Sequence, residues 1–151
     1  MTRLSFMWTI AIFLTAFTVN GQTTDSIRTN ILGKWTISKH TLPEKGKVVN
    51  KFKAAETKIT YEFRADGTYT NTSIWLFQGK WDTVVTVGKW KISPDKKNIL
   101  TYDSKFLPPH NKDGQEADHP QKIIKLTKME FVTEESLYSE TPGTSYYTKQ
   151  K

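Results

Sequence analysis

The feature that most constrains the fold of this chain is a two-residue alternation of apolar and polar side chains on either side of an Asp-Gly pair. In KITYEFRADGTYT, Ile59, Tyr61 and Phe63 alternate with threonine, glutamate and arginine. This period is typical of a strand with one buried face. Asp66 and Gly67 tolerate the positive φ of a two-residue hairpin turn, and TYTNTSIWLF continues as the return strand. The stretch therefore predicts a β-hairpin.

The same period continues towards the C-terminus. TVVTVGKWKI alternates, SPDKKN supplies turn residues, and ILTYDS resumes as a strand. QKIIKLT and EFVTEE form a further hairpin around TKM, TPGT closes that segment, and SYYTKQ is the last strand. We therefore predict an all-β fold, a single antiparallel meander of about eight short strands. It should roll into an up-and-down β-barrel, because closure leaves no sheet edge exposed.

The N-terminal residues have the composition of an export signal. After Arg3, residues 4–19 carry no charge, and this length fits a signal peptide better than a membrane span. We expect residues 1–21 to be removed between Gly21 and Gln22, which leaves 22–151 as one barrel domain in the periplasm or outside the cell. The alternative is an uncleaved membrane anchor. No cysteine stands at the cut, so the mature chain is not expected to be a lipoprotein.

Three other segments depart from the strand pattern. DSIRTNILGKW predicts a short helical turn capped by Asp25 or Ser26, with an apolar face that includes Ile27, Ile31 and Leu32. Residues 40–57 could hold a turn of helix or an irregular strand. Residues 104–121 are rich in proline, glycine and charge, which predicts a long exposed loop.

Charge and cysteine content narrow the functional classes. The chain has no cysteine, so disulfides and thiolate metal sites are excluded and packing must supply the stability. Its net charge is +7, and cleavage of the signal would leave 21 basic and 15 acidic side chains, a net charge of +6. The lysines are dispersed, which favours a solvated basic surface over a nucleic-acid-binding arm. Attraction to anionic envelope polymers or to a ligand carboxylate stays open.

We find no catalytic constellation in the sequence. A nucleophile elbow, a P-loop and a dinucleotide fingerprint are all absent. Glu134 and Glu135 are neighbours at a strand end and point to opposite faces, which indicates solvation rather than acid–base work. One charged cluster could collect a divalent cation, but its spacing matches no known metal motif, and a solvated loop or a lid over the barrel is favoured. That cluster consists of His110, Asp113, Glu116, Asp118 and His119. We therefore predict no enzyme activity, no cofactor and no metal.

The tripeptide Gly-Lys-Trp occurs at 33–35, 79–81 and 88–90. The first copy, in ILGKWTIS, resembles the Gly-x-Trp signature of lipocalins. YEFRADGTYT, VGKWKISPDKKNIL and KIIKLTKMEFVTEE are similar, in that order, to the hairpins of lipocalin-like domains in secreted Bacteroidetes proteins. The resemblance covers roughly residues 27–150 and implies a lipocalin-like barrel. It also implies that Gly33 and Trp35 form the barrel floor.

Where long-chain lipocalins place an arginine over the floor tryptophan, this chain has only Lys149 or Lys151. The biotin-contacting continuation of avidins is replaced by TISKHTL, so biotin binding is not expected. The other two tryptophans of the tripeptide differ from each other. Trp90 lies inside a strand, whereas Trp81 lies near a reversal and is expected to be partly exposed. Nine residues separate them, and we expect a turn or bulge near 79–83.

The resemblance favours a non-enzymatic module that binds a small hydrophobic or amphipathic ligand inside the barrel. The candidate lining residues are Tyr61, Phe63, Tyr69, Trp75, Phe77, Trp90 and Tyr102. The alternative is a packed barrel that acts through its surface, by its basic face, the 104–121 loop or Trp81. An envelope enzyme would require a cavity with a buried histidine or carboxylate. Nucleic acid is not an expected partner, no stable membrane anchor is expected in the mature chain, and no protein partner is predicted.

Overall fold

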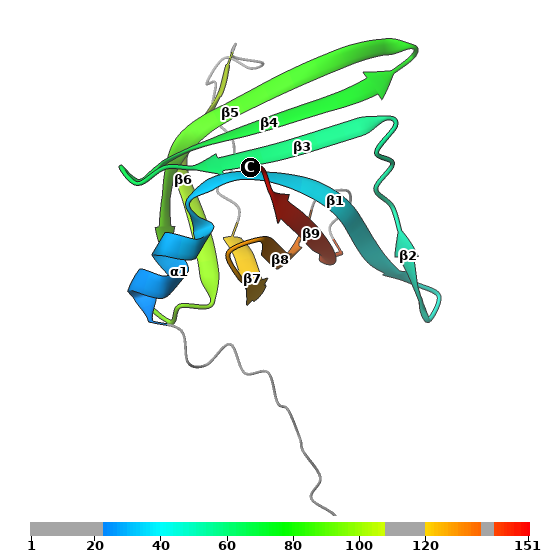
Figure 1. The fold of residues 1–151 in the computed structure, drawn as a ribbon. Helices are drawn as coiled ribbons and strands as arrows, with labels where there is room; N and C mark the ends of the chain where they lie inside the picture. Colours follow the sequence, from blue (N-terminus) through cyan, green and yellow to red (C-terminus); the bar gives the residue numbers. More distant parts are fainter. Residues whose placement is uncertain (1–22, 108–119, 137–140) are drawn as a thin grey trace, which may run out of the picture.

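The computed structural model describes residues 23–107, 120–136 and 141–151. Within these residues, one short helix precedes nine antiparallel strands (Figure 1). The elements are α1 (Thr24–Ile31), β1 (Gly33–Glu44), β2 (Lys47–Asn50), β3 (Thr57–Phe63), β4 (Thr68–Phe77), β5 (Lys80–Ile92), β6 (Asn98–Leu107), β7 (Pro120–Leu126), β8 (Glu130–Glu135) and β9 (Gly143–Lys149). The expected signal peptide at residues 1–21 lies outside the described residues.

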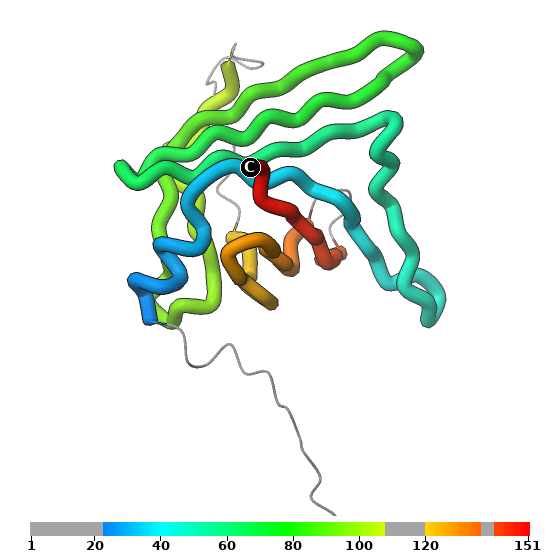
Figure 2. The backbone as a smooth tube through the Cα atoms, viewed as in Figure 1, coloured from blue at the N-terminus to red at the C-terminus, as the bar shows by residue number. Residues whose placement is uncertain are grey.

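Eight of these strands close into a barrel in the order β1-β3-β4-β5-β6-β7-β8-β9, with β9 pairing back onto β1. The ninth, β2, pairs with the far part of β1. Figure 2 shows the chain passing from β3 to β4 and from β4 to β5 through tight reversals. The prediction of an antiparallel up-and-down barrel is therefore confirmed.

The β3–β4 hairpin is present, but its turn is longer than predicted. The Arg64 N–H donates to the Thr68 carbonyl over 2.9 Å, and the Gly67 N–H donates to the Arg64 carbonyl over 3.1 Å. These bonds enclose three residues, 65–67, rather than two. Only Gly67 has a positive φ, of 85°, whereas Asp66 uses its carboxylate to accept from the Thr68 N–H over 2.9 Å. An Asp-Gly pair suits this turn as well as the shorter one, since both require glycine at the left-handed position.

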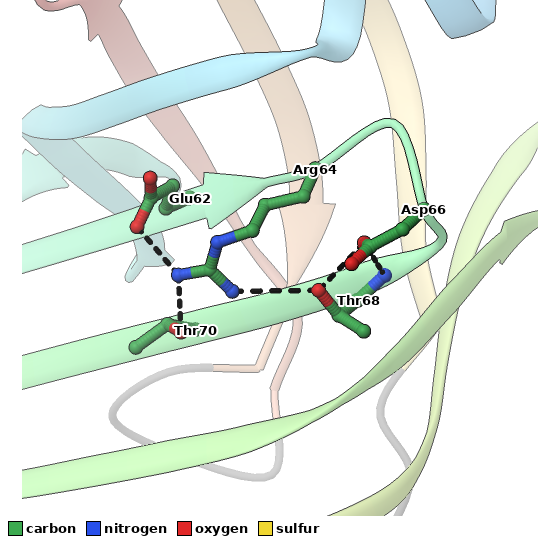
Figure 3. Close-up of polar contacts among 5 residues, drawn as sticks. All are labelled: Glu62, Arg64, Asp66, Thr68 and Thr70. Atoms are coloured by element: carbon green, nitrogen blue, oxygen red, sulfur yellow. Dashed lines mark hydrogen bonds and ion pairs between the residues drawn. The ribbon is translucent and has the colours of Figure 1, made fainter.

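Polar side chains reinforce the same turn (Figure 3). Arg64 Nη2 donates to Glu62 Oε2 over 2.7 Å and to Thr70 Oγ1 over 2.9 Å. The Thr68 backbone N–H, hydrogen-bonded to the ionised carboxylate, lowers the pKa of Asp66 from its usual value. Because these contacts join the outer faces of two paired strands at the surface, they support the hairpin rather than form a binding site.

Helix α1 is capped two or three residues earlier than predicted. The Thr23 hydroxyl accepts from the Ser26 backbone N–H over 3.2 Å, so Thr23 is the N-cap rather than Asp25 or Ser26. Threonine satisfies this otherwise unpaired donor as well as serine or aspartate does. The helix turns Ile27 and Ile31 into the core, as its spacing predicted. It is the only helix of the described residues, and it is far too short to span a membrane.

The barrel end beside α1, here called the closed end, is filled with aromatic side chains. Trp35 has no exposed surface, and its indole N–H donates to the Ile31 carbonyl over 2.7 Å. Its ring meets Phe131 edge to face, with centroids 5.7 Å apart. Phe63 packs against Trp90 in the same manner at 5.5 Å. Such pairs each contribute about 0.5–1.5 kcal/mol beyond the burial of their area, so the closed end is a packed core.

A lysine covers the tryptophan at this end. Lys149 Nζ lies 5.2 Å from the centre of the Trp35 ring and donates to the Asn30 carbonyl over 3.3 Å. Gly33, at φ 110°, makes room for it, because a Cβ there would lie 2.9 Å from Lys149 Cε. Of the two lysines that the sequence offered for this position, Lys149 is therefore the one that contacts the ring.

The structure describes residues 40–57 and parts of 104–121, the two long segments that departed from the strand pattern. Within 40–57, β1 continues and reverses at Lys45 and Gly46, and β2 returns along it, as an irregular strand would. The N–H groups of Glu56 and Thr57 then both donate to the Lys53 carbonyl over 2.9 Å, so this segment also contains a single helix-like turn. The ends of the expected 104–121 loop belong to β6 and β7, and they bury Ser104 and Gln121. The loop prediction was too long because charge and proline content do not reveal strand ends. Residues 108–119, with the charged cluster, lie outside the described residues.

The tryptophans of the second and third Gly-Lys-Trp copies, Trp81 and Trp90, lie on one strand, β5. The chain reverses at Gln78 and Gly79, at the edge of the expected region, and β5 then runs without a break. Because nine residues is an odd interval, Trp81 and Trp90 face opposite sides. Trp81 is 59% exposed and Trp90 only 4%. The irregularity in this part of the sheet lies further on, in the pairing with β6 near Asp103.

Candidate ligand cavity

A cavity of about 600 Å³ lies among β3, β4, the first residues of β6 and β7, and the end of β8. One wall comes from β3 and β4, where alternate residues face inward and pair directly across the two strands. The pairs are Thr57 with Trp75, Ile59 with Ser73, and Tyr61 with Asn71. The two-residue period of the sequence therefore produces this wall, and Ile59, Tyr61 and Trp75 give it an apolar surface.

The opposite wall is polar and comes from β6, β7 and the end of β8. Its charged residues are Lys122, Glu134 and Glu135. Lys122 Nζ lies 2.9 Å from Glu134 Oε1, and the two side chains are 56% and 43% exposed. Glu135 is different, because only 7% of it is exposed. The cavity is thus amphipathic, and its polar side contains one buried carboxylate.

Three donors hold that carboxylate in place, and we call Glu135 with its three partners the polar network. Glu135 Oε1 accepts from Thr133 Oγ1 over 2.7 Å and from the Tyr147 hydroxyl over 2.5 Å. Glu135 Oε2 accepts from Gln121 Nε2 over 2.8 Å. Burial, and then the negative charge of Glu135, raise the pKa of Tyr147 well above its usual value. Tyr147 therefore keeps its proton and remains a donor.

A buried histidine lies behind this network. His40 on β1 has no exposed surface, and its Nδ1 lies 2.7 Å from Ser145 Oγ. Burial lowers the pKa of His40 from 6.5, although the Glu135 carboxylate acts in the opposite direction. The ring is therefore neutral at pH 7. A Cβ at Gly143 would lie 2.5 Å from His40 Nε2, so the glycine of TPGT provides the space for the imidazole.

The seven aromatic residues named from the sequence lie in three different places. Tyr61 and Trp75 line the cavity. Phe63, Tyr69 and Trp90 are buried in the aromatic core. Phe77 is 63% exposed at the β4–β5 reversal, and Tyr102 lies beneath Lys91 Nζ at 4.9 Å, on the face opposite Trp90. Contact with a ligand stays a prediction for each of them.

Sequence reasoning missed Glu135 as a site residue. The side chains of Glu134 and Glu135 were predicted correctly to point in opposite directions. Only Glu134 is in contact with solvent, however, because its side chain is 43% exposed whereas Glu135 is 7% exposed. Strand parity could have found the difference, since Phe131, Thr133 and Glu135 share one face of β8, and the first of these is fully buried. Among the residues that the structure describes, no group of three or more histidine, aspartate or glutamate side chains could hold a metal ion.

Comparison with known proteins places the chain in a family. A model of the lipocalin-like domain matches residues 31–133. A lipocalin-like protein from Bacteroides uniformis is 18% identical, with a TM-score of 0.49, covering 80% of this chain and 99% of that one. A redesigned β-barrel is 12% identical, with a TM-score of 0.47, covering 83% and 96%. No curated protein matches. Because the family match spans more than half of the 151 residues, the chain belongs to the lipocalin-like domain family.

Proposed function

We propose that this protein is an exported, non-enzymatic binding protein whose domain, residues 22–151, takes a small hydrophobic or amphipathic molecule into the barrel. The observation that carries the proposal is the 600 Å³ cavity, with an apolar wall of Ile59, Tyr61 and Trp75 facing a polar wall. Ligand sites in proteins typically have volumes of about 300–1,000 Å³ and combine apolar surface with a few placed polar groups. Export rests on the uncharged N-terminal run after Arg3.

A binding role fits the buried polar groups better than catalysis does. His40 and Ser145 are hydrogen-bonded, as in a nucleophile–base pair, but both are fully buried and neither borders the cavity. A nucleophile must reach its substrate, so this pair is structural. Glu135 borders the cavity, but three donors already occupy its oxygens. That arrangement orients a carboxylate for recognition rather than for proton transfer.

The proposal is tested by native mass spectrometry of mature protein recovered from the periplasm of an expressing bacterium. We expect an added mass that disappears on denaturation. A Ser73→Phe variant should lose this mass because Ser73 lines the cavity. Thr72→Phe is the matched control, since its side chain faces the other side of β4. Equal ligand loads in both variants would contradict binding in the cavity.

A second candidate function is interaction with another protein through the β4–β5 reversal. Leu76, Phe77 and Trp81, here called the hairpin tip, are large apolar side chains that lie exposed at the β4–β5 reversal, where Leu76 pairs with Trp81 across the two strands. Exposed apolar patches commonly mark interaction surfaces. A Phe77→Ser/Trp81→Ser variant should then lose partner capture while it keeps the ligand of the wild-type protein.

A further inference from the structure

The cavity has a charge opposite in sign to that of the protein. The whole chain has a net charge of +7. Of the three charged residues that line the cavity, Lys122 and Glu134 neutralise each other across 2.9 Å. Glu135 remains, and no cation forms an ion pair with it among residues 23–107, 120–136 and 141–151. His40 does not compensate it, because burial lowers the pKa of His40 and keeps the ring neutral at pH 7.

The hydrogen bonds of Glu135 are those of an ionised carboxylate that can accept one more donor. Its two oxygens offer about four acceptor positions, and the three hydrogen bonds of the polar network occupy three of them. Two of these bonds reach Oε1 and only one reaches Oε2. Burying a charge without a counter-charge is unfavourable, so a cation delivered to this oxygen by a ligand would be strongly favoured.

Gln121 holds the same carboxylate from outside the cavity lining. Its amide nitrogen must face Glu135, because an ionised carboxylate cannot donate, and this orientation fixes the position of the amide oxygen. That oxygen is buried, the residue is only 2% exposed, and no donor reaches the oxygen among the described residues. A buried acceptor of this kind is costly unless a donor satisfies it. An ammonium group has three N–H donors, and Glu135, which borders the cavity, is the acceptor of this pair that a ligand in the cavity meets.

The wall across the cavity favours the same chemistry. Tyr61 and Trp75 present aromatic rings, which attract cations through their faces and also accept apolar chains. An anionic head group would instead meet the Glu135 carboxylate. Building on the proposed binding function, we infer that the cavity selects amphipathic molecules with a protonated amine, that Glu135 is the carboxylate that recognises the amine, and that the β3–β4 wall receives the apolar part.

Isothermal titration calorimetry at neutral pH with decylamine, decanol and decanoate, each below its micelle concentration, tests this inference. The three probes share one apolar chain and differ in head-group charge. We expect wild-type protein to bind decylamine at least about tenfold more tightly than decanol, and decanoate most weakly. Glu135→Gln should reduce the preference for decylamine over decanol to nearly one. Glu130→Gln is the matched control and should keep it, because Glu130 lies on the same strand outside the cavity lining, where it is exposed and paired with Lys125.

The outcomes separate the inference from the function on which it rests. Equal binding of decylamine and decanol by wild-type protein would overturn the amine preference and leave the binding cavity standing. A preference that survives Glu135→Gln would overturn the role of Glu135. No binding of any probe would contradict both proposals. Near-ultraviolet circular dichroism establishes whether Glu135→Gln has folded, and if it has not, the wild-type comparison of head groups decides the amine preference by itself.

Discussion

At the closed end of the barrel, Trp35 and Phe131 pack with ring centroids 5.7 Å apart, whereas beside the cavity Glu135 and Tyr147 meet through a 2.5 Å hydrogen bond. In both regions, the side chains come from the inward-facing positions, which are every second residue along each strand. The closed end is filled by rings and covered by α1, so its stability comes from burial and close packing. Beside the cavity, hydrogen bonds join the polar side chains to one another, although the Gln121 amide oxygen has no donor among the described residues.

Tyr147 belongs to both regions. Its ring stacks on Phe131 at 5.5 Å and meets Tyr61 edge to face at 5.8 Å, while its hydroxyl donates to Glu135. The carboxylate that borders the cavity is therefore anchored in the aromatic core. The comparison indicates that the packed end serves as the rigid support on which the binding groups are positioned, as precise recognition requires.

The largest effect is expected from breaking the closed end. Trp35→Ala should lower the free energy of unfolding by about 3–5 kcal/mol, because it removes a fully buried indole and leaves a cavity. Trp81→Ala should change it by no more than about 0.5 kcal/mol, since that side chain is mostly exposed. Urea unfolding at equilibrium measures both. Similar losses in the two variants would refute the division between a packed end and an exposed hairpin tip.

The next effect concerns the link between the two regions. Tyr147→Phe keeps the stacked ring and deletes the donor to Glu135, which should cost about 1.5–3 kcal/mol of unfolding free energy. Tyr146→Phe is the matched control on the outer face, where the ring contacts Lys39 at 5.2 Å and the substitution retains that contact. The same urea titration applies. A Tyr147→Phe protein as stable as the control would mean that the hydrogen bond adds nothing.

A smaller effect is expected from uncovering the tryptophan at the closed end. Lys149→Met removes the cation over the Trp35 ring and the hydrogen bond to the Asn30 carbonyl, which together should contribute about 1 kcal/mol. Lys151→Met, at the exposed chain end, should have no measurable effect. Thermal unfolding of the two variants side by side gives the difference. If Lys151→Met is the more destabilised variant, the assignment of the covering lysine is wrong.

The last prediction concerns pH at the cavity end. Because the pKa of His40 is lowered in the folded protein, the unfolded chain binds a proton first as the pH falls below 6.5. The contribution of neutral His40 to the free energy of unfolding is present above pH 6.5 and is lost as the pH falls through the folded-state pKa of His40. Unfolding free energies at about pH 7.5 and about pH 5.5 should therefore differ less in His40→Gln than in wild type. His110 and His119 are present in both proteins, so only the difference between wild type and variant reports on His40.

The barrel could be predicted because its information is local. The alternation in residues 57–63, the glycine at position 67 and the spacing of later turns each specify a strand or a reversal, and the structure confirms them. Errors fell where two local patterns compete. Thr23, Asp25 and Ser26 are all good N-caps, and only packing of α1 on the core selects Thr23. The extent of β6 and β7 depends in the same way on partners that are distant in the sequence.

The candidate site could be predicted only in part. Tyr61 and Trp75 were named as lining residues and border the cavity, since the period of two orients both. Phe77 and Tyr102 were named for their aromatic character, which is shared by core and surface positions and does not report depth. Glu135 was not identified because its neighbour Glu134 is also a glutamate, and the sequence alone does not show which of the two is buried. Its partners come from β7, β8 and β9, and no local pattern joins them.

By itself, therefore, the sequence determined the strands, their order, the inward faces and the place of Trp35, because these depend on side-chain period, turn residues and a family signature over short stretches. Only the tertiary structure decided which part of the barrel is filled and which is open. It also decided that one carboxylate of an adjacent pair is buried among three donors. The physical reason is that burial and hydrogen-bond satisfaction depend on residues brought together by closure of the sheet, and β1 meets β9 only when the barrel forms.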